Sequence, residues 1–537
     1  MALMQCMEKK KNFKLDNVNG VMHYSLLLLS LLAPATTSSL RSSKDSKFEL
    51  RRRRYGRCVA LSPGPTRVAC LSRSDPRLLD WPAGLEVEWR LPIGCDFSGF
   101  FVEVALGYVP DLLEAGIPVR LLQHRCPDAF LDGMLTPREA RAYRIAQRED
   151  DARTPAMSAR SIAIEHAEPC KMRRFTRAPR RIISRTMSEG LLDAQQVACL
   201  NGAADEVWLP TWRHATLFRR SGMSADVRAV VIPESADVAF FDRSEEMLLA
   251  CGGGGDGANG SDGSACVWAL RSISNANGTA EASFPFSRPL LDRRVVFLSV
   301  FKWEWRKGWD VLISAYWDEF NINDDDVVLV LKTFKPHWEP GPADVEDWIA
   351  DLALKRDKKR AALPRIVVVQ RDLSRREMRR LYAAADTFVL PTRGEGWGLP
   401  AFEAMTMALP TIVTDCAGPS AFTSKRTAFP LRVASTHANG KAEPSKGHLQ
   451  ALMRRVYACV DSQRRESAKR GTGRPGQRRR SRRGGGGGTG PAAVCVETAI
   501  KAERAHWRIR EHFHPRTVAS TIVSRLRAIA REASANI

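Results

Sequence analysis

Two glutamates, Glu395 and Glu403, lie eight residues apart in the segment Leu390-Pro-Thr-Arg-Gly-Glu-Gly-Trp-Gly-Leu-Pro-Ala-Phe-Glu-Ala-Met405. The first lies among glycines. The second follows Pro400, which suits the first turn of a helix because no backbone donor is needed there. An ionised carboxylate only accepts hydrogen bonds, so it can hold the hydroxyl groups of a sugar or a ribose. Two carboxylates can therefore hold a polyhydroxy ligand, but the specific signal is the set of residues around them and not their spacing.

The glycine-rich turn follows the apolar run Thr387-Phe-Val-Leu390, which predicts a buried strand. A turn from strand to helix leaves backbone N–H groups free, and the helix dipole adds positive potential. Such a place can hold anions or polar oxygens. The alternative interpretation is a solvated loop before an amphipathic helix.

A second group of residues is cationic and lies in the segment Ser299-Val-Phe-Lys-Trp-Glu-Trp-Arg-Lys-Gly-Trp-Asp-Val-Leu-Ile313. Lys302 ends a predicted strand, and Lys307 precedes a predicted helix. Fixed cations and helix amides can stabilise negative charge on a ligand. The alternative is a pair of surface cations.

The segment Arg393-Gly-Glu-Gly-Trp-Gly-Leu-Pro400 resembles the donor-site motif of the group-1 (family 4) retaining glycosyltransferases, which have the GT-B fold. The segment around Lys307 is similar to that family's diphosphate-binding segment. The resemblance implies two Rossmann-like, doubly wound α/β domains that face a cleft. It also implies transfer of a sugar, a hexose above all, from a nucleotide-sugar donor with retention of configuration and without a metal or other cofactor.

The resemblance further assigns roles to residues. Glu395 would contact the sugar, Glu403 would hold the ribose, and Lys307 would steady the leaving group. The family usually has Gly-Arg where this chain has Phe301-Lys302, so either Lys302 or Arg306 could supply the second cation. The remaining donor-binding candidates lie in the glycine-rich turn: Gly396, Trp397, Gly398 and Leu399.

The first predicted domain offers weaker candidates. His166 follows the predicted strand 161–165, where the family often carries a histidine near the transferred sugar; a structural histidine is the alternative. A small-residue turn with Gly94, Ser98 and Gly99 could approach the pyrophosphate, and a plain tight turn explains it equally well.

Strands that alternate with helices predict parallel, doubly wound sheets. We expect a first, acceptor-binding domain over 81–250 and a second, nucleotide-sugar-binding domain over 291–461, separated by a low-complexity insert or linker over 251–290. Residues 462–492 are rich in Arg and Gly and are predicted to be unstructured, and closing helices are expected over 493–537.

The N-terminus has the pattern of a targeting segment. Four lysines precede an apolar run, and Ala33-Pro-Ala35 offers small residues for cleavage. We therefore expect a signal peptide or signal anchor over 1–35, a disordered stem over 36–80, and passage through the secretory pathway. Membrane attachment is expected only through this segment. An oxidising lumen would allow disulfides such as Cys251–Cys266, and the insert also holds two glycosylation sequons.

The net charge of +22 would first suggest nucleic acid. Residues 1–57 carry +8 and residues 464–483 carry +9, so most of the charge lies in predicted tails and inserts, and no nucleic-acid partner is expected. No C-x-x-C pair indicates a zinc site, and the acidic run Asp324–Asp326 fits a strand cap better than a metal site.

The donor could be a UDP- or GDP-sugar, and the acceptor could be a glycan, a lipid or a protein. A catalytically inactive protein that binds nucleotide sugars or glycans is the alternative function.

Overall fold

The computed structural model describes residues 58–60, 68–70, 81–91, 108–123, 126–128, 131, 135–148, 161–173, 179–235, 237–242, 295–321, 325–342, 344–355, 363–471 and 491–534. The predicted signal segment 1–35, most of the stem 36–80 and the insert with Cys251 and Cys266 lie outside the described residues. So does the turn with Gly94, Ser98 and Gly99. Met1–Asp80 forms one unit and Trp81–Ile537 another. In the first unit, β1 (Cys58–Ala60) and β2 (Val68–Cys70) pair antiparallel.

A seven-stranded parallel sheet occupies the first part of the second unit, with the order β5-β4-β3-β6-β7-β8-β9. Its strands are β3 (Glu86–Arg90), β4 (Val119–Leu122), β5 (Gln147–Arg148), β6 (Ser161–Glu165), β7 (Arg181–Arg185), β8 (Glu206–Leu209) and β9 (Arg228–Val231). Helices α4 (Val109–Glu114), α6 (Pro137–Ala146), α7 (Ala194–Ala203) and α8 (Trp212–Ser221) connect them. Buried apolar strands flanked by helices are typical of a parallel sheet covered on both faces.

A six-stranded parallel sheet follows, with the order β12-β11-β10-β13-β14-β15. Its strands are β10 (Val295–Lys302), β11 (Val327–Phe334), β12 (Ile366–Val369), β13 (Thr387–Leu390), β14 (Thr411–Thr414) and β15 (Phe429–Leu431). The connecting helices are α11 (Trp309–Glu319), α12 (Val345–Leu354), α13 (Arg375–Ala384) and α14 (Leu399–Thr406). The predicted fold class, two Rossmann-like parallel α/β domains, is confirmed.

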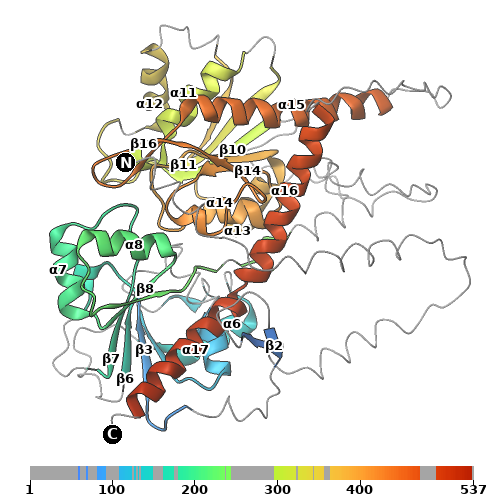
Figure 1. The fold of residues 1–537 in the computed structure, drawn as a ribbon. Helices are drawn as coiled ribbons and strands as arrows, with labels where there is room; N and C mark the ends of the chain where they lie inside the picture. The colour runs from blue at the N-terminus through green and yellow to red at the C-terminus, as the bar shows by residue number, and fades with distance from the viewer. Residues whose placement is uncertain are drawn as a thin grey trace, which may run out of the picture. The chain divides into compact units, whose positions relative to one another are not determined.

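The strand order of the second sheet reverses between β10 and β13. Right-handed crossovers then place α11 and α12 on one face of the sheet and α13 and α14 on the other, as Figure 1 shows. Ligands of open α/β sheets bind beyond the carboxyl ends of the strands at such a reversal. The segments after β10 and β13 are those that carry Lys307 and Glu395.

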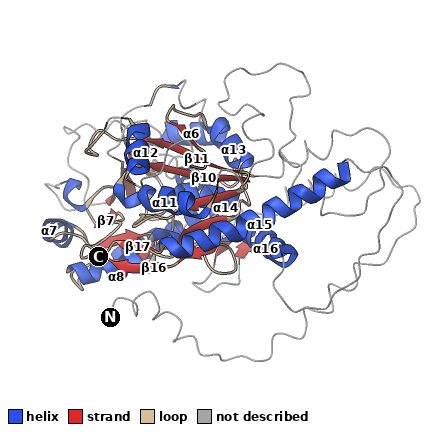
Figure 2. Ribbon diagram, turned by 90° about the horizontal axis from the view of Figure 1, so that it is seen from above, coloured by secondary structure: helices blue, strands red, loops and turns tan. Residues whose placement is uncertain are grey.

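Three long helices end the described chain: α15 (Lys446–Gly471), α16 (Pro491–His512) and α17 (Pro515–Ser534). Helix α15 packs against α11 and α16, and Figure 2 shows its far end running outward from the sheet. The prediction that 462–492 is unstructured is wrong at its start, because α15 continues to Gly471. Gln, Arg, Glu, Ala and Lys in this stretch are good helix formers. Residues 472–490 lie outside the described residues.

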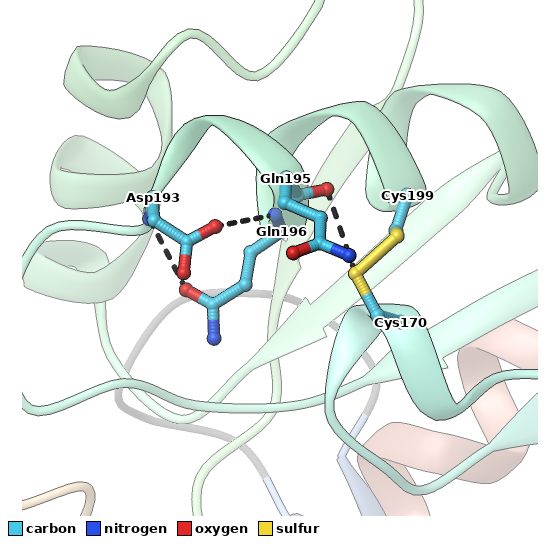
Figure 3. The surroundings of a disulfide bond; sticks show 5 residues. All are labelled: Cys170, Asp193, Gln195, Gln196 and Cys199. Atoms are coloured by element: carbon cyan, nitrogen blue, oxygen red, sulfur yellow. Dashed lines mark hydrogen bonds between the residues drawn. A yellow bond between two sulfur atoms is a disulfide. The ribbon is translucent and has the colours of Figure 1, made fainter.

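Two disulfides join described elements. Cys170, in the turn that follows β6, is bonded to Cys199 in α7 (Figure 3). The same helix begins at an N-cap where the side chains of Asp193 and Gln196 each accept a hydrogen bond from the other's backbone N–H. Cys459 in α15 is bonded to Cys495 in α16. Among the helices that the structure describes, none is both long enough and apolar enough to cross a membrane.

Helix α17 contributes to the core of the first sheet. Val518, Ile522 and Leu526 are buried in the same apolar cluster as the strands β3 and β6. Next to them, Arg525 binds Glu206 of β8, with Nε–Oε1 at 2.9 Å and Nη2–Oε2 at 2.5 Å. Glu206 is fully buried, and Arg525 supplies the positive charge that compensates its buried carboxylate.

We predict that Arg525→Ala lowers the free energy of unfolding by about 3–5 kcal/mol, because Glu206 would remain as a buried charge without its cation. Urea unfolding of the purified chain would measure the change. The matched control is Arg531→Ala on the exposed side of the same helix, which should stay within about 0.5 kcal/mol of the parent. Equal effects of the two variants would contradict the importance of the buried pair.

Candidate functional site

The loops that follow β10 and β13 are bonded to each other at the reversal of strand order. The Ser299 hydroxyl of β10 donates to the Val389 carbonyl of β13 at 2.5 Å. Farther along, the Arg393 backbone N–H and the Thr392 hydroxyl both donate to the Arg306 carbonyl, at 2.6 and 3.0 Å. These bonds bring two segments that are about ninety positions apart in sequence into one loop cluster.

A buried ion pair lies at the centre of this cluster. Lys307 Nζ lies 2.7 Å from both carboxylate oxygens of Glu395. Both side chains are at most a tenth exposed. Arg306 adds a second cation, with Nη1 3.8 Å from Glu395 Oε2, and it also contacts Glu304 at 2.8 Å and Glu189 at 3.3 Å. The predicted cations and the predicted sugar-binding carboxylate are therefore brought together.

The pKa values of the two cations shift in opposite directions in these surroundings. Burial lowers the pKa of Lys307, and the Glu395 carboxylate offsets part of that effect. Burial also disfavours charge on Arg306, but Glu395, Glu189 and Glu304 together raise its pKa above the usual value. A ligand with negative charge would find one fixed cation in Arg306 and one, Lys307, that is already neutralised by Glu395.

Glu403 lies on α14, apart from this pair. Its Oε2 accepts a hydrogen bond of 2.7 Å from the Tyr382 hydroxyl of α13. Burial raises the pKa of Glu403 to about 7, although the Tyr382 bond and the charge of Arg375 lower it and Asp237 raises it further. The carboxylate therefore changes charge near neutral pH. Sequence reasoning missed Tyr382 because no local pattern shows a contact between two helices.

The glycine-rich turn presents backbone and little side chain. Trp397 is buried among Phe402, Phe422 and Phe513, so its indole is a core group and only its backbone can meet a ligand. Gly398 has φ +94° and begins α14, with Leu399 as the first helical residue. The positive φ explains why a glycine is needed at this helix start.

A loop of the first sheet covers the same turn. A Cβ on Gly396 would lie 2.2 Å from Met187 Sδ, and one on Gly394 would lie 2.6 Å from the Glu189 carbonyl oxygen. The glycines therefore allow residues 187–190 to approach the turn closely. This loop was not among the predicted site residues, and the glycine run was the only signal that something large lies against it.

Two further predicted residues, Lys302 and His166, contact other groups. Lys302 is exposed, and its Nζ lies 5.5 Å from the centre of the Trp338 ring and 6.0 Å from that of Phe334. His166 is buried beside Trp89, and burial together with Arg185 holds its pKa well below the usual value. His166 is therefore a neutral group inside the first domain, next to the end of β6.

Arg393 is a further residue of the cluster that sequence reasoning did not single out. Its guanidinium binds both oxygens of Asp310 at 2.8 Å and both oxygens of Glu443 at 2.7 and 3.0 Å. Its Cζ also lies 4.2 Å from the centre of the Trp305 ring. Arg393 thus fixes the start of α11 and the strand β17 (Ala442–Pro444) to the base of the glycine-rich turn.

The described residues hold no group of three or more His, Cys, Asp and Glu side chains that could bind a metal ion. Within the acidic run before β11, Asp325 is paired with Arg454 at 2.6 Å, and the Asp326 backbone N–H donates to the Tyr457 hydroxyl. These contacts agree with a structural role for the two residues.

Part of the chain matches a known protein family. Residues 292–442 match the family model described as "Glycosyl transferases group 1". The match contains all six strands of the second sheet, β10 to β15, together with Lys307, Glu395 and Glu403. No curated protein sequence matches the chain.

Several solved structures are similar at low identity. HepE of Anabaena in complex with UDP-glucose is 12% identical, with a TM-score of 0.47 over 83% of this chain and 100% of that chain. Sucrose-phosphate synthase from Thermosynechococcus elongatus is 13% identical, with a TM-score of 0.48 over 83% and 99%. A glycosyltransferase from Rickettsia africae ESF-5 is 12% identical, with a TM-score of 0.49 over 85% and 100%.

Gly308 leads to a prediction about the close approach of the loops after β10 and β13. It has φ +69°, and a Cβ there would lie 2.0 Å from the Pro391 carbonyl oxygen. We predict that Gly308→Ala destabilises the fold by more than about 2 kcal/mol, because strain and overlap would push the loops after β10 and β13 apart.

Thermal and urea unfolding would test this change against Gly202→Ala. Gly202 lies in α7 with open space around its Cα, so its replacement should stabilise the chain by about 0.5 kcal/mol. A Gly308→Ala protein as stable as the parent would show that the two loops need no close approach.

Proposed function

We propose that this chain is a glycosyltransferase that moves a sugar, a hexose above all, from a UDP- or GDP-sugar to an acceptor with retention of configuration. The observation that carries the proposal is the buried contact between Lys307 and Glu395 at the reversal of strand order. It lies inside the segment that matches group 1 glycosyltransferases. Glu403, on the helix that follows the glycine-rich turn, adds the carboxylate for the ribose.

Each group has a role that follows from its chemistry. The bond from the anomeric carbon of the sugar to the diphosphate breaks as the diphosphate takes the electron pair, and negative charge grows on the leaving oxygens. A hydroxyl of the acceptor forms the new bond to the same carbon on the same face, and its proton passes to the departing diphosphate. Arg306 and Lys307 stabilise that charge, and the backbone N–H groups at the start of α14 can bind oxygens of the sugar or phosphate. The Glu395 carboxylate then accepts hydrogen bonds from two partners, the sugar hydroxyls and Lys307.

The same arrangement suggests an order of events. In the structure the negative charge of Glu395 offsets the positive charge of Lys307, and this allows the lysine to be charged although it is buried. When a diphosphate binds, it brings negative charge that Lys307 can share. Glu395 is then released in part to accept hydrogen bonds from the sugar. The ion pair would thus couple diphosphate binding to sugar binding.

A direct assay tests the proposal as a whole. The full chain is incubated with a panel of UDP- and GDP-sugars, and release of nucleoside diphosphate and binding heats are both measured. Turnover of one or more donors is expected. Saturable binding with no release of nucleoside diphosphate would favour the alternative, a protein that binds nucleotide sugars without transfer.

We predict that Glu395→Gln lowers turnover about a hundredfold or more, because a neutral amide supports neither the sugar hydroxyls nor Lys307 in the same way. The change keeps the shape of the side chain, and the far-UV spectrum and melting temperature report whether the fold survives. Glu346→Gln, on the exposed side of α12, is the control and should keep normal turnover. A folded Glu395→Gln protein with normal turnover would remove the glutamate from the mechanism.

We predict that Lys307→Ala depresses turnover strongly and that Lys307→Arg restores only part of it, since a guanidinium differs in geometry from an ammonium. We also propose that protein cations take the place that a metal fills in other transferases. Activity of the parent chain should therefore persist in excess EDTA. Loss of transfer in EDTA, with recovery on adding magnesium or manganese, would contradict the metal-free mechanism.

We predict that donor affinity weakens as the pH falls through about 7. The ribose hydroxyls need an ionised Glu403, and its pKa is about 7 in the free protein. Affinity should therefore be constant well above pH 7 and fall by up to about tenfold per pH unit below it. Tyr382→Phe removes a hydrogen bond that lowers this pKa, so the fall should begin at higher pH.

Calorimetric titrations with the donor between pH 5.5 and 8.5 would measure this dependence. Glu403→Gln is the reference, because any pH dependence of donor affinity that remains in this variant comes from the ligand or from other groups of the protein. A parent protein whose affinity changes with pH no more than that of Glu403→Gln would show that Glu403 does not hold the ribose.

A further inference from the structure

Three exposed aromatic side chains lie close to the candidate site without a role in it. Trp338 is 56% exposed, Phe334 is 42% exposed and Trp305 is 41% exposed. Phe334 ends β11, Trp338 lies in the loop that follows, and Trp305 lies in the turn between β10 and α11. Large apolar side chains left in solvent beside a site commonly mark a place where a ligand binds.

The Trp338 ring is held in place and connected to the ion pair. Its indole Nε1 donates to Glu304 Oε1 at 3.1 Å. The other oxygen of Glu304 lies 2.8 Å from Arg306, and Arg306 contacts Glu395 at 3.8 Å. A continuous chain of polar contacts therefore runs from the exposed ring to the carboxylate that we assign to the sugar.

Trp305 is fixed in a similar way. The Arg393 guanidinium lies over its ring at 4.2 Å, and the His437 ring meets it edge-on at 5.2 Å. Its backbone N–H donates to Glu339 Oε1 of the Trp338 loop at 3.2 Å. Both tryptophans thus belong to one bonded group of loops, so little rotamer freedom remains to be lost when a ligand binds.

The position of these rings separates them from the ribose carboxylate. Glu403 and its partner Tyr382 lie on α14 and α13, which cover one face of the sheet. The Trp338 loop joins β11 to α12, which covers the other face together with α11. The carboxylate that we assign to the ribose and the exposed rings therefore belong to elements on opposite faces of the sheet.

We propose that Trp305, Phe334 and Trp338 form a subsite that binds a sugar ring of a glycan acceptor. The apolar C–H face of a pyranose packs on an aromatic ring, and its hydroxyls need polar partners at the rim. Lys302 and Glu339 supply such partners beside the rings. A lipid chain would need a continuous apolar surface, and these charges interrupt it. The inference rests on the proposed function, which it extends by naming the class of acceptor.

The test compares Trp338→Ala with Trp507→Ala. Trp507, on α16, is 58% exposed, and its indole also donates to a glutamate, Glu503. The two substitutions therefore remove the same kind of group from two places. The parent chain and both variants are applied to a printed glycan array, and the saccharides that the parent binds are titrated by calorimetry. UDP and GDP are titrated separately.

We expect Trp338→Ala to weaken saccharide binding about tenfold or more, with Trp507→Ala unchanged and with one nucleotide dissociation constant for all three proteins. A Trp338→Ala protein that binds the saccharides as the parent does would overturn the proposal. So would a parent chain that binds UDP or GDP but no saccharide. A Trp338→Ala protein that loses only nucleotide affinity would assign the ring to the nucleobase instead. If saccharides bind and neither nucleotide does, the proposed function fails while the aromatic subsite stands.

Discussion

A charged lysine and a charged glutamate are tolerated in the interior of this protein only because they face each other. Lys307 and Glu395 come from loops that follow β10 and β13, and each would be a costly buried charge without the other. The pair therefore fixes the distance between the two loops at the reversal of strand order. Arg306, Arg393 and Gly308 act on the same distance, since each bonds or closely approaches the opposite loop. The rest of the second domain is arranged around that constraint.

Local patterns predicted much of this arrangement. Apolar runs located the strands of both sheets, and the glycine-rich turn with Pro400 located the start of α14. The parallel topology followed from strands that alternate with helices. The association of Lys307 with Glu395 also followed, because both lie at carboxyl ends of strands and the resemblance placed them in one site. The strands and the helix start depend on neighbours in sequence, which is why a single sequence could show them, whereas the association of Lys307 with Glu395 spans 88 positions and needed the resemblance.

Other features depend on contacts that no local pattern contains. The hydrogen bond from Tyr382 to Glu403 joins two helices, and the approach of Met187 to Gly396 joins two sheets. The position of the Lys302 side chain near the Trp338 ring depends on the loop after β11. The helical start of the Arg-rich segment was missed for a different reason: its overall composition hid a stretch of good helix formers before Gly471.

The return of α17 to the first sheet has a consequence for biosynthesis. The sheet that a ribosome makes first buries residues from Val518 onward, and the pair of Glu206 with Arg525 spans 319 positions. Its apolar surface therefore stays uncovered while the whole second sheet is being synthesised. Contacts of such high sequence separation slow folding, because loop-closure entropy must be overcome before they form. The nascent first domain would thus remain a client for chaperones until its last helix arrives.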